Sequence, residues 1–152
     1  MISSRLIQKI LVATDGSEPS LKAAQYAAEI AKCNKAEVTL IYAAEATSVT
    51  EFVRMAFPLS EPLSKDIHET GMLIIERAKK PFLEADIAVR SKIIEGFAAD
   101  VILDEAKSGH YDLIAMGSRG TSGTLRRVFL GIGSVAERVL GSAPCPVLVA
   151  RT

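Results

Sequence analysis

Residues 7–14 have the sequence IQKILVAT, and Asp15-Gly16-Ser17 follow them directly. The run is nearly continuous in apolar residues and rich in β-branched ones, which is typical of a central strand buried on both faces of a sheet. After the turn, Ser17 is placed to cap a helix whose first turn tolerates Pro19. The apolar positions that recur there at helical spacing are Leu21, Ala24, Ala27, Ala28 and Ala31. The segment therefore predicts a strand, a tight turn and a helix.

The same alternation continues along the chain. Apolar runs predict further strands at residues 37–43, 87–93, 112–116 and 147–150, and the alternating pattern of residues 87–93 places that strand near a sheet edge. Helical periodicity lies between them, at residues 64–83, 98–108 and 134–140, with Gly109 placed to end the second of these helices. Such alternation implies right-handed crossovers. We therefore predict an α/β fold, with a doubly wound five-stranded parallel sheet and helices on both faces.

The composition indicates a single domain over residues 1–152. At 49% apolar residues the chain can bury a continuous core without disulfides or metals. Its 18 basic and 18 acidic residues balance, so no net field favours nucleic acid or an anionic membrane as a partner. The sequence has no signal-peptide pattern and no membrane span, and Cys33 and Cys145 lie in no zinc or redox motif. We expect a cytoplasmic protein.

A long connection, residues 47–62, interrupts the regular alternation. It contains two prolines and no clear period, yet it carries Phe52, Val53, Met55 and Phe57. A connection of this length usually has a function of its own. The sequence does not distinguish a lid from a partner surface.

Two segments compete for the ligand site, which open α/β sheets place beyond the carboxyl ends of their strands. The first is residues 13–17, where the first strand ends in a carboxylate and a turn. The second is residues 117–123 followed by Gly133-Ser134 at a helix start. Glycines let backbone N–H groups approach an anion, and a helix amino terminus adds unpaired donors and the positive end of its dipole. The combination predicts a phosphate cradle.

Each part of this cradle also has a purely structural interpretation. Ser134 and Glu137 form a capping-box pattern, so the serine hydroxyl could satisfy its own helix. Arg126 and Arg127 could lie on a solvated face, and Asp15 could be a turn former. The composite of glycines, hydroxyl groups and a helix start after a buried strand favours the phosphate site.

Several common enzyme motifs are absent. Residues 131–136 satisfy G-x-G-x-x-A but do not directly follow a predicted strand, and the sequence contains no Walker A pattern. His68 and His110 have no partners at ligand or triad spacing, and no nucleophile elbow occurs. A phospho-acceptor receiver domain needs an acidic pair where Asp15 stands alone. We assign no catalytic residue.

Four motifs together resemble the universal stress protein family, in its ATP-binding branch. They are ILVATDGS at residues 10–17, DLIAMGSRG at 112–120, GSVAERV at 133–139 and APCPVLV at 143–149. The similarity covers almost the whole chain except residues 44–62. It implies a Rossmann-like fold similar to the adenine nucleotide alpha hydrolases, with strand order 3-2-1-4-5.

The phosphate motif of that branch is Gly, two residues, Gly, nine residues, Gly and then Ser or Thr. The resemblance places it on Gly117, Gly120, Gly133 and Ser134. This chain has twelve residues between Gly120 and Gly133, three more than the family pattern. A match through Gly131 keeps the spacing better but puts Ile132 in place of the hydroxyl residue, so Gly133-Ser134 is preferred.

The resemblance implies ATP, or ADP or AMP, as the ligand, with Mg²⁺ or Mn²⁺ held through the phosphates near Asp15. It also implies a set of cofactor-binding residues that runs from the adenine, through the ribose, to the phosphates. These residues are Ala13, Thr14, Asp15, Ala43, Met116, Gly117, Arg119, Gly120, Gly133, Ser134 and Val135.

The expected function is that of a dimeric, nucleotide-binding stress-response regulator with an unidentified protein partner. The resemblance implies that the homodimer pairs the last strand, residues 147–150, across a two-fold axis, which would protect an apolar edge. Two alternatives stay open. One is a slow ATPase or autophosphorylating enzyme, and the other is an interaction module that binds no nucleotide.

Overall fold

The computed structural model describes residues 6–45, 61–119 and 132–152, with the backbone alone described for residues 61–67. Within these residues the strands are β1 (Lys9–Ala13), β2 (Glu37–Ala44), β3 (Val89–Glu95), β4 (Leu113–Gly117) and β5 (Val147–Ala150). The helices are α1 (Glu18–Asn34), α3 (Glu61–Glu84), α4 (Ala98–Gly109) and α5 (Ser134–Ser142). Most of the long connection predicted at residues 47–62, and the segment 120–131, lie outside the described residues.

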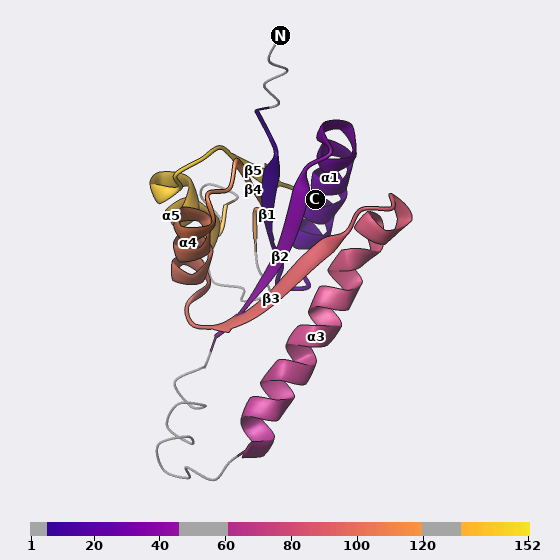
Figure 1. Ribbon diagram of the computed structural model, residues 1–152. Helices are drawn as coiled ribbons and strands as arrows, with labels where there is room; N and C mark the ends of the chain where they lie inside the picture. The colour runs from indigo at the N-terminus through magenta and orange to yellow at the C-terminus, as the bar shows by residue number, and fades with distance from the viewer. Residues whose placement is uncertain (1–5, 46–60, 120–131) are drawn as a thin grey trace.

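The strands form one parallel sheet in the order β3-β2-β1-β4-β5 (Figure 1). Both the predicted fold class and the predicted strand order are confirmed. The first strand lies at the centre because its side chains are apolar in both directions, and Ile10, Leu11 and Val12 are fully buried. β3 lies at an edge, as its alternating sequence predicted, and exposes Arg90, Ser91 and Lys92.

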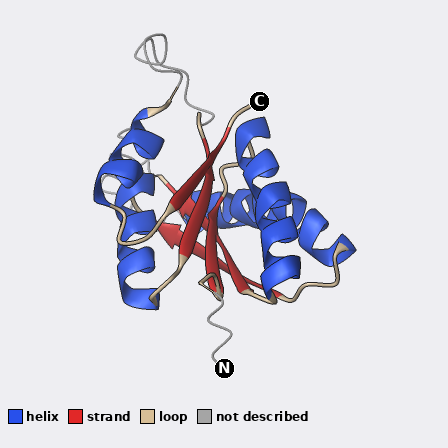
Figure 2. Cartoon of the chain, turned by 90° about the horizontal axis from the view of Figure 1, so that it is seen from above, coloured by secondary structure: helices blue, strands red, loops and turns tan. Residues whose placement is uncertain are grey.

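Helices cover both faces of the sheet (Figure 2). On one face α1 and α3 pack against a core that includes the buried alanines of α1 and Phe82 of α3. On the other face α4 and α5 pack against a second core that includes Ile102 and Val139. The small side chains of α1 let this helix lie close to the sheet, which matters for the site described below.

The amino terminus of α1 is built as the sequence predicted. Ser17 is the N-cap, and its hydroxyl accepts the N–H of Ser20 at 3.4 Å. Pro19 lies in the first turn, where its missing N–H costs no helical hydrogen bond.

Several helix ends differ from the prediction, and α5 runs two residues further than predicted, to Ser142. α4 continues through Gly109, and His110 takes the left-handed conformation at its end, with φ 53°. Gly109 is needed for space instead: a Cβ on it would lie 2.3 Å from the ring of Tyr111. α3 begins at Glu61, three residues before the predicted start, and Met72 on this helix is 51% exposed although it fits the apolar period.

The start of β1 is joined to the start of β4. The carboxylate of Asp112 accepts the backbone N–H groups of Gln8 at 2.9 Å and Lys9 at 3.0 Å. In return the N–H of Asp112 donates to the carbonyl of Lys9 at 2.8 Å. These bonds set the register of the two central strands from their first residues.

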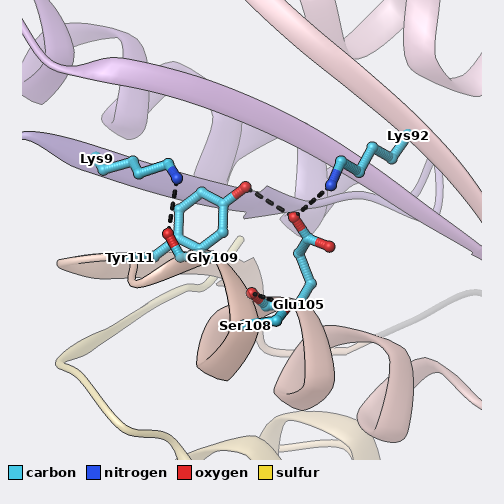
Figure 3. Close-up of polar contacts among 6 residues, drawn as sticks. All are labelled: Lys9, Lys92, Glu105, Ser108, Gly109 and Tyr111. Carbon is cyan, nitrogen blue, oxygen red and sulfur yellow. Dashed lines mark hydrogen bonds and ion pairs between the residues drawn. The ribbon is translucent and has the colours of Figure 1, made fainter.

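A polar cluster fastens the end of α4 to the sheet (Figure 3). Glu105 accepts hydrogen bonds from Lys92 of β3 at 2.8 Å and from the Tyr111 hydroxyl at 2.9 Å. Lys9 of β1 donates to the carbonyl of Gly109 at 2.7 Å and lies over the Tyr111 ring. Burial opposes ionisation of Glu105, but the hydrogen bonds from Lys92 and Tyr111 and the charge of Lys92 outweigh it and lower the pKa of this carboxyl.

Two further observations concern membrane-spanning helices and the cysteines. Among the described residues, no helix is both long enough and apolar enough to cross a membrane. Cys33 and Cys145 are both free thiols, and Cys33 is exposed.

The lowered pKa of Glu105 predicts an acid-sensitive contribution to stability. A carboxyl whose folded-state pKa lies below its unfolded-state value stabilises the fold above the unfolded-state pKa, and this contribution is lost as the pH falls through the folded-state pKa. We expect Glu105→Gln to lower the free energy of unfolding at pH 7 and to flatten its decline below about pH 5. Denaturant unfolding measured between pH 7 and pH 3 tests this. The exposed neighbour Asp104, changed to Asn, is the control. An identical pH dependence in Glu105→Gln and the parent would show that the cluster does not contribute.

Candidate functional site

A cavity of about 450 Å³ lies at the carboxyl ends of β1, β2 and β4. This is within the range of small-molecule and cofactor sites. All the predicted binding residues within the described part of the chain line it, and Gly120 lies outside that part. The predicted residues around the cavity are Ala13, Thr14, Asp15, Ala43, Met116, Gly117, Arg119, Gly133, Ser134 and Val135.

Direct contacts join the two chain segments that the sequence analysis singled out. The hydroxyl of Ser17, after β1, donates to the carbonyl of Arg119, after β4, at 3.3 Å. The N–H of Gly133 donates to the carbonyl of Ser118 at 2.6 Å. The turn after β1, the loop after β4 and the start of α5 therefore border one cavity.

Gly117 makes the closest of these approaches possible. A Cβ on Gly117 would lie 2.6 Å from the backbone nitrogen of Ser20 and 2.8 Å from Pro19. The first turn of α1 thus lies directly against the end of β4, at a distance that excludes any side chain. Besides its predicted role beside a ligand, this glycine has a packing role that the motif alone did not reveal.

Buried hydroxyl groups form the polar part of the cavity wall. Ser20 donates to the carbonyl of Ser17 at 2.8 Å, and its oxygen lies 3.2 Å from that of Thr14. Since the Ser20 proton is used, Thr14 donates to Ser20. The carboxylate of Asp15 accepts the N–H of Ser17 at 3.0 Å, and Gly16 completes the turn with φ 83°. This turn holds the Asp15 carboxylate at the cavity.

The start of α5 differs from the capping box considered for Ser134 and Glu137. Gly133 is the N-cap and has no side chain to cap the helix, and Ser134 is the first helical residue. The N–H of Glu137 donates to the carbonyl of Gly133 at 3.0 Å. The capping-box interpretation is wrong because Ser134 lies one position too far into the helix. Its hydroxyl and the first N–H groups of α5 lie beside the cavity, where an anion can accept from them.

The sequence analysis missed a group of cavity residues. These residues are Ser20, Ile41, Tyr42, Glu45, Thr70, Ile74, Ala98, Ile102, Ser118 and Ala136. Ser118 lies in the segment 117–123 that the sequence analysis singled out, but it was not predicted as a binding residue. Tyr42 and Glu45 lie within two residues of Ala43 at the end of β2, so the sequence could have predicted them from Ala43. The cavity residues on α3 and α4 are brought to the site by the chain crossovers, and no local sequence pattern marks them.

Tyr42 is held against α3, because Gly71 leaves room for its ring: a Cβ on Gly71 would lie 2.9 Å from it. Burial raises the pKa of Tyr42, and the nearby charges of Asp15 and Glu45 raise it further. Two carboxylates therefore lie near one phenol on this wall. Among the described residues, no group of three or more His, Cys, Asp or Glu side chains could hold a metal ion.

A family model and the similar curated proteins named below indicate the same protein family. The Universal stress protein family matches residues 6–151. A universal stress protein of Methanocaldococcus jannaschii is 40% identical over 147 residues, covering 96% of this chain and 83% of that protein. The universal stress protein YxiE of Bacillus subtilis is 32% identical over 151 residues, covering 96% of this chain and all of that protein (100%).

Solved structures give the same result for the fold. The universal stress protein UspA from Lactobacillus plantarum superposes with a TM-score of 0.75 and 28% identity, covering 95% of this chain and 97% of that one. A universal stress protein solved in complex with cAMP has a TM-score of 0.68 and 23% identity, covering 95% and 96%. One from Archaeoglobus fulgidus in complex with dAMP has a TM-score of 0.63 and 18% identity, covering 96% and 99%.

The contact at Gly117 generates a stability prediction. We expect Gly117→Ala to lower the free energy of unfolding by about 1–3 kcal/mol, because the new methyl group displaces the first turn of α1. Gly141→Ala is the matched control, since a Cβ there meets no atom within 4 Å. It should be neutral or stabilising by at most about 1 kcal/mol. Chemical denaturation of both variants measures the difference, and equal stabilities would mean that the close approach does not constrain the fold.

Proposed function

Because this chain belongs to the universal stress protein family, we propose that it binds ATP, or ADP or AMP, in the cavity beside β1, β2 and β4. The observation that carries the proposal is the convergence of the Asp15 turn with the start of α5 at one cavity. Each segment alone has an ordinary structural interpretation. Together they supply a carboxylate for a ribose and unpaired N–H donors for phosphates within the space of one ligand.

The phosphate end of the cavity is lined by residues that carry hydrogen-bond donors. The first N–H groups of α5, the Ser134 hydroxyl and the Arg119 guanidinium are borne by residues that line the cavity. A helix amino terminus attracts an anion through these donors and through its dipole. The net charge of the chain is zero, so this local arrangement is what favours a phosphate.

The choice of adenine as the base follows the ligands found in proteins of the same fold. Two proteins of this fold were solved with cAMP and with dAMP. At 23% and 18% identity their likeness to this chain is one of fold. It makes adenine nucleotides the ligands to test first, with ATP, ADP and AMP compared.

The proposed divalent cation needs ligands from the nucleotide. The described residues offer the Asp15 carboxylate at the cavity and no preformed cluster for a metal. This donor set fits Mg²⁺ or Mn²⁺ bound mainly by phosphate oxygens and water, as Mg²⁺ usually is in nucleotide sites.

The proposed role is that of a cytoplasmic, homodimeric regulator whose nucleotide state changes a partner surface. β5 (Val147–Ala150) is an edge strand, and Val147, Leu148 and Val149 are only half-buried. An apolar edge with open backbone groups is prone to pair with another strand, and a second copy of β5 across a two-fold axis satisfies it. Hydrolysis is not required for such a role.

Calorimetric titration with ATP and Mg²⁺ tests the nucleotide proposal. We expect heat of binding and a raised melting temperature, because a ligand that binds only the folded state stabilises it. Asp15→Ala should weaken ATP binding by about tenfold or more, since it removes a charged acceptor from the cavity. Asp15→Asn keeps an acceptor for the Ser17 N–H, so it distinguishes the effect of losing the charge from the effect of disturbing the turn. Asp104→Ala, exposed on α4 and outside the cavity, should bind as the parent does. Absence of both heat and stabilisation with ATP, ADP and AMP would contradict the proposal.

Sedimentation velocity tests the dimer. We expect a mass of about twice 16.3 kDa at micromolar concentrations, with dissociation on dilution. A species of 16.3 kDa that persists up to about 100 μM would contradict pairing through β5.

A further inference from the structure

Glu45 lies at the end of the cavity that is opposite the proposed phosphate site. Across the sheet, β1 separates β4 from β2, and α5 follows β4. A nucleotide whose phosphates lie at the start of α5 and whose ribose lies near Asp15 therefore extends its base toward the end of β2. The cavity residues there are Ile41, Ala43 and Glu45, with Ala98 and Ile102 from α4.

The walls at this end of the cavity are largely apolar. Ile41, Ala43 and Ile102 belong to one apolar cluster between the sheet and α4. Apolar walls hold a base by burying its faces, but they do not distinguish one purine from another. A polar group beside these walls is needed to select among bases.

The exposed side chain of Glu45 forms a hydrogen bond to the start of α4. Its Oε1 accepts the N–H of Ala98, the first residue of that helix, at 2.9 Å. The N-cap residue Phe97 makes no side-chain capping bond, and Glu45 supplies a side-chain acceptor at this helix start instead. One carboxylate oxygen of Glu45 therefore accepts from Ala98, and the other can accept from a ligand. An ionised carboxylate accepts hydrogen bonds and donates none.

We propose that Glu45 selects the base, by accepting a hydrogen bond from an exocyclic amino group of the ligand. The amino group of adenine is at ring position 6, where hypoxanthine and guanine carry a carbonyl oxygen, and the amino group of guanine is at position 2. At position 6 a carboxylate accepts a hydrogen bond from the amino group and repels the carbonyl oxygen. This inference rests on the proposed nucleotide function and names the residue that decides which nucleotide is bound.

The test compares ATP with ITP in the parent and in Glu45→Gln. The variant keeps the length of the side chain and an oxygen for the Ala98 N–H, and it replaces the second oxygen with an NH₂ donor. We expect the parent to bind ATP at least about tenfold more tightly than ITP. In Glu45→Gln the ratio of the two dissociation constants should fall by about tenfold or more, because ATP binding weakens while the inosine carbonyl gains a donor. Glu29→Gln, an exposed change on α1 away from the cavity, should leave the ratio unchanged.

A second measurement needs no variant. The triphosphate of purine riboside, which has no substituent in place of the amino group, should bind the parent at least about tenfold more weakly than ATP. Equal affinity for these two ligands, or an unchanged ATP-to-ITP ratio in a folded Glu45→Gln, would overturn the role of Glu45 while leaving the nucleotide site intact. A parent that binds neither ATP nor ITP would instead overturn the nucleotide function and this inference with it.

Discussion

The position of β1 between β2 and β4 is the constraint on which the site depends. From β1 the chain builds the sheet outward through β2 to β3 at one edge. It then crosses back to β4, on the other side of β1, and ends with β5 at the opposite edge. Right-handed crossovers then put α1 and α3 on one face and α4 and α5 on the opposite face. The helices diverge where the strand order reverses, and a crevice opens at the carboxyl ends of the central strands. The cavity follows from topology before any side chain is considered.

Close backbone contacts turn this crevice into a polar pocket. Gly117 allows the first turn of α1 to lie against β4, and the same turn carries the Ser20 hydroxyl that pairs with Thr14. Buried polar groups are costly unless they are hydrogen-bonded. Among the described residues, no buried side-chain nitrogen or oxygen lacks a partner. The wall of the cavity is therefore polar without destabilising the core beneath it.

α4 is fastened to the sheet near both of its ends, and this links the site to the opposite edge of the molecule. At its start Glu45 of the β2 connection accepts the N–H of Ala98. Near its end Glu105 binds Lys92 and Tyr111, and Lys9 binds the carbonyl of Gly109. A helix held at two points gives the cavity a rigid wall on the side where we place the base.

The sequence by itself determined the strand-helix alternation, the central place of residues 7–14, the cap at Ser17 and the two segments, residues 13–17 and 117–134, that border the cavity. These features have local causes: apolar period, turn chemistry and capping. The family resemblance added the strand order, which no local pattern encodes. Only the tertiary structure decided that Gly117 serves a helix contact, that Gly133 rather than Ser134 caps α5, and that Glu45 reaches α4. Each of these depends on an element distant in the chain, and a linear pattern carries no information about which crossover brings that element within bonding distance.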